Sequence, residues 1–127
     1  MGTQQLLLVI LGIIIVGIGI AVGIGLFSAT SVSSNKDAII NDMMNISQYA
    51  YRYKLKPEPL GGGGRFYTGF ILPSKLASNE NATYTAVSTT PTSVTITATS
   101  LIGYGTIANI LDSTGTLGTY TYTGDFQ

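Results

Sequence analysis

The side chains that could do chemistry are few in this chain, and their types exclude most enzyme mechanisms. The 127 residues contain no Cys and no His, so thiol nucleophiles, imidazole bases and the usual zinc ligands are absent. The carboxylates of Glu58, Glu80, Asp112 and Asp125 show no paired spacing, whereas a glycosidase or a metal site needs at least two that converge. We therefore expect no catalytic residue, no metal, no cofactor and no small-molecule substrate, and a protein that is not an enzyme.

Covalent sugar is the one modification that the sequence suggests. Asn45-Ile-Ser47 and Asn81-Ala-Thr83 fit the N-glycosylation pattern, although short patterns of this kind also arise by chance. We expect Asn81 to lie in a loop, which makes it the better candidate of the two.

The charged residues are scarce and unevenly placed. The net charge is zero and only 9% of residues are charged, against about a quarter in typical domains. This balance gives no electrostatic reason to expect a nucleic-acid partner. Residues 1–35 carry no ionisable side chain. All six basic and all six acidic residues lie between Lys36 and the C-terminus.

The N-terminal part contains an apolar run long enough to span a bilayer. Leu6 to Phe27 is 22 residues without a charge, and a helix of this length covers about 33 Å. Its stretch "VGIGIAVGIG" alternates small and branched residues, the period of a β-strand. A lone strand in lipid leaves its backbone groups unpaired, at several kcal/mol each, so we expect a helix.

The small residues of this run also lie at the spacing that places side chains on one face of a helix. Gly17, Ala21 and Gly25 are four residues apart, and so are Gly19 and Gly23. Such stripes let two helix backbones approach closely in apolar surroundings. The alternative is that they are lipid-facing filler in an ordinary membrane anchor.

The helix is expected to continue beyond the apolar run as an amphipathic segment over residues 28–56. A helical stripe of apolar residues supports this, at Ile39, Met43, Ile46, Ala50 and Tyr53. Pro57 and Pro59 should end it. Tyr49, Tyr51 and Tyr53 are expected to pack at the end of this helix. We expect Lys36, Asp37 and Asp42 to be solvated, with ion pairing between subunits as the alternative.

The remainder is expected to be a linker over residues 57–65 and a strand-rich surface domain over residues 66–127. Gly61 to Gly64 do not form a phosphate-binding loop, because no Gly-Lys-Ser/Thr follows. Val94, Ile96 and Ala98 alternate with Thr and predict one buried face. Strands are expected over residues 66–72, 82–89, 92–100, 103–111 and 118–124. The predicted fold class is α+β: a long N-terminal α-helix, apolar then amphipathic, packed on a small antiparallel β-sheet domain.

The charges next to the apolar run conflict with a surface domain. The nearest basic residues lie on its C-terminal side, at Lys36, Arg52, Lys54 and Lys56, and the positive-inside rule would place that side in the cytoplasm. A low-charge domain rich in Thr, Ser and Tyr instead suits an exposed surface. A basic leader that once preceded residue 1 and was removed would resolve the conflict.

These features together resemble a mature type IV pilin, although likeness of sequence is confined to the N-terminal half. The resemblance implies that a membrane peptidase cuts off a basic leader and that subunits pack their N-terminal helices into the core of an extracellular filament. The implied partners are further copies of the chain in a homopolymer, the inner membrane before assembly, and the prepilin peptidase with the pilus assembly machinery. The β-domain would face solvent and provide adhesion or shielding.

Two positions depart from the family pattern. Bacterial members start with a methylated Phe and carry a glutamate as the fifth residue, where this chain has Met1 and Gln5. Cleavage between Gly2 and Thr3 would instead put Leu7 at the fifth place. Archaeal pilins also lack the glutamate; we favour a bacterial origin and leave an archaeal one open. The residues expected to carry assembly are Met1, Gln5, Leu6, Leu7, Ile10, Ile14, Gly17, Ala21 and Gly25.

The glycine stretch is expected to be helical in the bilayer and to extend in the polymer, with melting centred on Gly17, Gly19, Gly23 and Gly25, because glycine makes extension cheap. A second functional hypothesis is a single-pass, membrane-anchored binding module, or a minor pseudopilin of a secretion system, that never forms long polymers.

Overall fold

One long helix and one small sheet make up this protein. A computed structural model describes residues 2–127, in two compact units that divide after Ser33. Helix α1 (Gly2–Leu55) supplies the described residues of the first unit and opens the second, Ser34–Gln127. Its single span confirms the predicted N-terminal helix to within one residue at its C-terminal end. The fold is α+β, as the sequence predicts.

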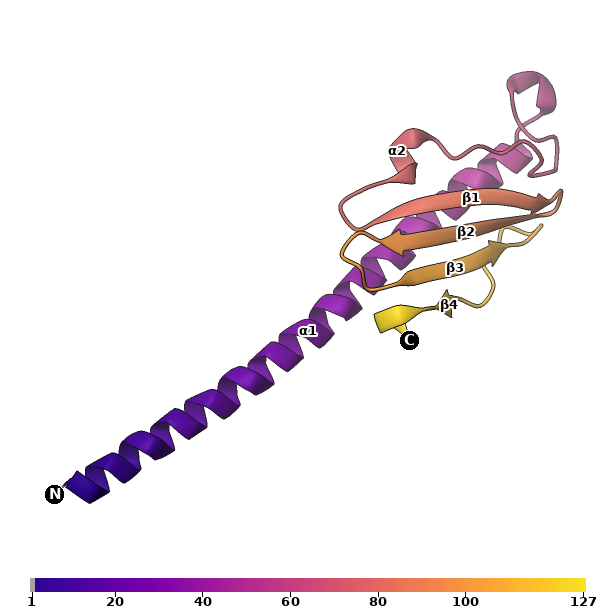
Figure 1. The fold of residues 1–127 in the computed structure, drawn as a ribbon. Helices are drawn as coiled ribbons and strands as arrows, with labels where there is room; N and C mark the ends of the chain where they lie inside the picture. Colours follow the sequence, from indigo (N-terminus) through magenta and orange to yellow (C-terminus); the bar gives the residue numbers. More distant parts are fainter. Residues whose placement is uncertain (1) are drawn as a thin grey trace. The chain divides into compact units, whose positions relative to one another are not determined.

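The second unit contains a four-stranded antiparallel sheet in simple sequential order (Figure 1). Each strand pairs with the next along the chain, and the strands are β1 (Ala82–Thr90), β2 (Ser93–Ser100), β3 (Thr106–Leu111) and β4 (Thr121–Tyr122). Three short helices accompany them: η1 (Glu58–Leu60), α2 (Ser74–Ala77) and η2 (Gly124–Phe126). Sequential antiparallel pairing needs only short connections, which suits a domain of this size.

One face of the sheet and one stripe of α1 form the hydrophobic core. Val94, Ile96 and Ala98 of β2 are fully buried while the Thr residues between them are half-exposed, so the predicted alternation is confirmed. On α1 the predicted stripe is buried at Ile39, Met43, Ile46 and Ala50. A sheet of this size has too little apolar surface to be stable by itself, so residues 34–55 of α1 complete its core.

Three of the five expected strands are corrected by the structure. Residues 66–72 form no strand: the chain turns at Thr68–Gly69, where Gly69 has a positive φ of 80° and the backbone N–H of Phe70 donates to the carbonyl of Tyr67. The strand expected over residues 103–111 begins only at Thr106, because Gly103 and Gly105 both have positive φ, a conformation that breaks a strand. The last expected strand is reduced to Thr121–Tyr122.

The segment predicted as a linker is a hydrogen-bonded cap on the end of α1. The backbone N–H groups of Gly63, Gly64 and Arg65 donate to the carbonyls of Tyr53, Lys56 and Lys54 at 2.8, 3.1 and 2.8 Å. These carbonyls belong to the last turn of the helix or follow it, where intrahelical donors run out. A Cβ on Gly63 would lie 1.8 Å from the carbonyl oxygen of Phe66. Glycine is therefore required here for close packing.

The core predicts unequal effects for two truncations on α1. Ile46 is 1% exposed and Met44 is 47% exposed. Ile46→Ala should lower the free energy of unfolding by about 2–5 kcal/mol, and Met44→Ala should change it by about 0.5 kcal/mol or less. Urea unfolding of the full chain in detergent, followed by near-ultraviolet tyrosine signals of the second unit, measures both. Equal midpoints for the two variants would contradict the assigned core.

Candidate assembly site

The first unit presents an apolar surface that the chain itself does not cover. Between Leu6 and Phe27 the large side chains are exposed by 52% or more, reaching 74% at Phe27. This part of α1 is long and apolar enough to cross a membrane by its length and composition. An apolar surface of this extent needs lipid or protein against it.

Most of the predicted assembly residues fall on one face of α1. Steps of three or four residues place side chains on the same side of a helix, and such steps connect Leu6, Ile10, Ile14, Gly17, Ala21 and Gly25. Leu7 lies at the edge of this assembly stripe. Gln5 lies on a nearly opposite face with Gly12, Gly19 and Gly23, so the structure does not group it with the stripe. Met1 is outside the described residues.

The glycines of the first unit have no role in the packing of the isolated chain. A Cβ added at Gly12, Gly17, Gly19, Gly23 or Gly25 would meet no atom within 4 Å, and each of these residues is helical. Around Gly12 and Gly17 the helix surface is hollowed into an open groove of about 560 Å³, bordered by Val9, Ile13, Val16 and Ile20. The packing of the single chain therefore gives no reason for these glycines.

The "VGIGIAVGIG" stretch is regular α-helix in the single chain. This agrees with the helical state expected before assembly. Its extension in a polymer stays a prediction.

The second unit has a polar junction between α1 and the sheet. Asn35, 7% exposed, accepts a hydrogen bond from the Ser100 hydroxyl at 3.0 Å and donates to the carbonyl of Asn81 at 3.4 Å. Asp42 Oδ2 accepts from the Tyr84 hydroxyl at 2.5 Å and from the amide of Asn79 at 2.7 Å. These bonds give buried polar groups the partners they need.

Two of the three residues expected to be solvated, Lys36 and Asp42, are half-exposed and also have partners within the chain. Asp42 belongs to the junction, and Lys36 Nζ lies 4.0 Å from the centre of the Tyr122 ring, a cation–π contact. Asp37 is exposed. Sequence reasoning missed the junction, although Asn35 lies four residues before Ile39 and Asp42 three after it, which places both beside the buried stripe.

The two sequons differ in access. Asn81 is half-buried, and its amide Nδ2 donates to Asp42 at 3.3 Å. Asn45 is exposed on α1. A sugar attached to the side-chain nitrogen of Asn81 would compete with the hydrogen bond from that nitrogen to Asp42. By this geometry the exposed side chain of Asn45 is the more accessible of the two.

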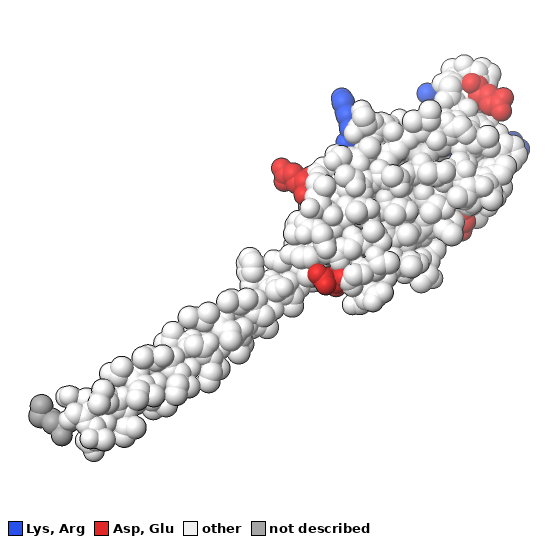
Figure 2. Space-filling model, in the orientation of Figure 1, with Lys and Arg blue, Asp and Glu red and all other residues white. Residues whose placement is uncertain are grey.

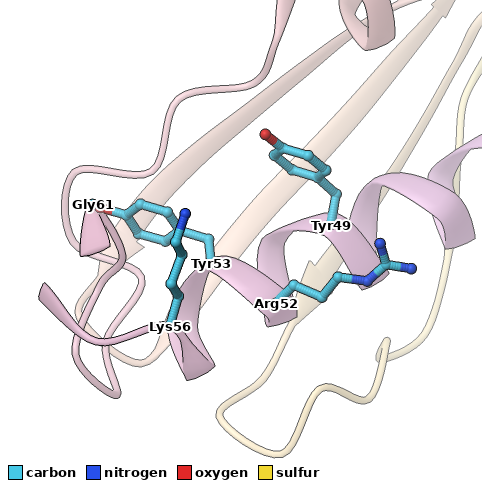
Figure 3. Close-up of a pocket in the computed structure, with 5 residues that line it drawn as sticks. All are labelled: Tyr49, Arg52, Tyr53, Lys56 and Gly61. Atoms are coloured by element: carbon cyan, nitrogen blue, oxygen red, sulfur yellow. The ribbon is translucent and has the colours of Figure 1, made fainter.

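Aromatic packing closes the C-terminal end of α1. The rings of Tyr49 and Tyr53 lie 6.0 and 5.4 Å from the ring of Phe70, and the Tyr53 hydroxyl donates to the carbonyl of Thr68 at 2.8 Å. The predicted packing role of these tyrosines is confirmed. Figure 3 shows them beside Arg52, Lys56 and Gly61, around a groove of about 220 Å³.

The carboxylates do not converge in the structure. The described residues 2–127 contain no group of three or more His, Cys, Asp or Glu side chains that could hold a metal ion. Asp112 accepts hydrogen bonds from Thr114 and Thr116, and these hold the pKa of its carboxyl below the usual value. The role of Asp112 is thus to fix its own turn.

Two buried tyrosines titrate far from their ordinary range. Burial, and next the neighbouring charge of Asp112, raise the pKa of Tyr67 to about 12. Burial, and next the hydrogen bond to Asp42, raise the pKa of Tyr84 even further. In both cases the folded protein favours the neutral phenol.

In comparisons with models of protein families, with curated proteins and with solved structures, the chain matches none. Its architecture is nevertheless the generic pilin-like one: a long N-terminal helix, apolar in its first part, with a small antiparallel sheet packed on its second part.

The raised tyrosine pKa values predict alkaline unfolding of the second unit. A phenol whose pKa is raised by folding stabilises the fold fully below its unfolded pKa of about 10, and this stability is lost as the pH rises toward the folded value. Above pH 10, we expect the free energy of unfolding to fall by at most about 1.4 kcal/mol per pH unit for each tyrosine.

Urea unfolding of the full chain in detergent between pH 7 and pH 12 tests this. Tyr84→Phe should reduce the steepness of the alkaline loss, and Tyr49→Phe, at an exposed position, serves as the matched control. A flat profile from pH 7 to pH 12 in the wild type would contradict the assignment.

Proposed function

We propose that this protein is the structural subunit of an extracellular, type IV pilus-like filament that polymerises through its hydrophobic N-terminal helix. One observation carries the proposal: the 22-residue apolar surface of Leu6–Phe27 is uncovered, and its glycines leave space that no part of the chain fills. Copies of the same helix fit such a surface, because small residues allow close helix–helix contact where no water drives association.

The other parts of the chain have roles consistent with this. Before assembly the apolar run holds the subunit in the membrane, where a peptidase removes a leader and the assembly machinery receives it. In the filament the sheet faces solvent, with its Thr-rich outer face available for adhesion or shielding. The role is structural, with no catalytic step.

Gln5 replaces a charged contact by a neutral one in this proposal. Its amide carbonyl can accept a hydrogen bond from the N-terminal amine of a neighbouring subunit. A carboxylate at this place would cost free energy among apolar helices unless it were fully paired. Gln5 thus gives a weaker contact without the risk of an unpaired buried charge.

The glycine stretch would extend when the helix enters the filament core. Glycine lowers the cost of leaving the helix, by roughly 1 kcal/mol per residue against alanine in a water-exposed helix. Backbone groups that are freed must then be bonded by neighbouring chains. A filament map with regular helix from Gly12 to Gly25 would reject this part of the proposal.

Electron microscopy of material sheared from the cell surface, with the subunit identified by mass, tests the main proposal. We expect uniform thin filaments that contain this chain. The proposal would be refuted if the chain stayed in the membrane fraction and formed a small discrete particle after solubilisation in detergent. That outcome would favour the second candidate, a single-pass anchored binding module or minor pseudopilin, which the same apolar helix also allows.

Two neighbouring enlargements test the assembly stripe. Ala21→Leu fills the stripe, and Val22→Leu enlarges a residue on another face of the same helix. Overfilling a packed contact costs about 1–3 kcal/mol, so Ala21→Leu should reduce filament yield about tenfold or more, and Val22→Leu should keep it near wild type. Immunoblots of the sheared and cell-bound fractions give both yields, and equal yields would show that the stripe is not the packing face.

A further inference from the structure

The charged residues of the second unit are sorted toward its two ends. Three exposed acids gather where α1 carries residues 34–42: Asp37, Glu80 and Asp125. Asn35 on α1 donates to the carbonyl of Asn81, which follows Glu80, and Lys36 covers the ring of Tyr122, three residues before Asp125. Lys36 is the one basic residue among them, so this acidic end has a net negative charge.

The opposite end is basic. It gathers four basic residues and two acids around the end of α1: Arg52, Lys54, Lys56, Arg65, Glu58 and Asp112. The backbone N–H of Arg65 donates to the carbonyl of Lys54, and Lys54 Nζ donates to the carbonyl of Ser113, next to Asp112. Asp37 and Arg52 are fifteen residues apart on one helix, about 22 Å. The second unit is therefore electrically polar along α1.

The basic end offers a surface as well as a charge. Arg52 and Lys56 are both exposed, and they border the groove that also contains Tyr49, Tyr53 and Gly61 (Figure 3). On the face of the molecule in Figure 2, the few charged groups stand on a mostly uncharged surface. Charges concentrated in this way on a nearly uncharged protein direct association more than a dense mixture would.

We propose that the basic groove of one copy receives the acidic end of the next copy, with Arg52 and Lys56 facing Asp37 and Asp125. The occupant is a second copy of this chain because its own acidic end has the complementary charge. The two surfaces are different, so the contact is head-to-tail and can repeat without closing. This inference rests on the proposed filament and adds the surfaces through which successive sheet domains meet.

Charge reversal in the full chain tests this contact. One variant carries Arg52→Glu and Lys56→Glu, and the other carries Asp37→Lys and Asp125→Lys. Each variant alone brings like charges together, so we expect its critical concentration for filament formation, measured by sedimentation at low salt, to rise about tenfold. In an equimolar mixture opposite charges face each other again in alternating copies, and we expect recovery to within about twofold of wild type.

Two controls make the outcome specific. Lys75→Glu changes an exposed lysine of α2 that the proposed contact does not include, and it should assemble as wild type. Because exposed charges are screened by salt, the difference between wild type and the reversed variants should shrink at high salt. Circular dichroism checks that both variants keep the helix.

Several results would overturn the proposal. If wild-type filaments form and both reversed variants assemble equally well, the contact is wrong while the filament stands. If the Arg52/Lys56 variant assembles normally but loses retention on heparin, the groove serves an anionic polymer instead. If wild type forms no filament, the filament proposal fails. Sedimentation of the detergent-solubilised reversed variants, each alone and mixed, then tests the contact by itself. Association of the two variants only in the mixture supports the contact, and no association in the mixture overturns it.

Discussion

The structure depends on one constraint, which is that 22 consecutive apolar residues in helix α1 are covered by no other part of the chain that the structure describes. In water this surface would be costly at every exposed side chain, so the protein can persist only where lipid or protein covers it. The absence of charge before Lys36 fits both environments equally well. A segment in lipid has to satisfy its own backbone hydrogen bonds, and a helix does so; the proposed filament adds the requirement that the same segment then pack against protein.

The second part of α1 has a smaller apolar surface, and the sheet of the second unit covers it. The sheet has one apolar face and too few residues to form a core alone, and residues 34–55 of α1 supply the missing layer. The polar junction of Asn35, Asp42 and Tyr84 fixes the register of this contact, because a shift along the helix would leave buried polar groups without partners. The glycine loop then bonds the last carbonyls of the helix, and α1 ends at Leu55, five residues after Ala50, the last buried residue of its stripe.

The sequence predicted those elements whose pattern repeats and missed those set by single residues. The long helix, the buried stripe from Ile39 to Ala50 and the alternation in β2 follow from periodicity. The turn at residues 66–72 was predicted as a strand because Phe, Tyr and Ile favour strands locally, whereas Gly69 imposes a positive φ there. The partners of Asp42 could not be foreseen, because they come from β1 and the loop before it, about forty residues away, and contacts across such distances have no local pattern.

The glycines of the chain divide into two groups, and this division is the strongest argument for a partner of the first unit. In the second unit, glycines such as Gly63 and Gly105 stand where a Cβ would collide with backbone at about 2 Å, so the fold itself demands them. In the first unit, Gly17 and Gly25 have empty space around them and ordinary helical conformation. Each glycine destabilises a helix, and no packing contact within the single chain offsets this cost. In the proposed filament, a second helix in close contact, or a conformational change on assembly, would supply the compensating interaction.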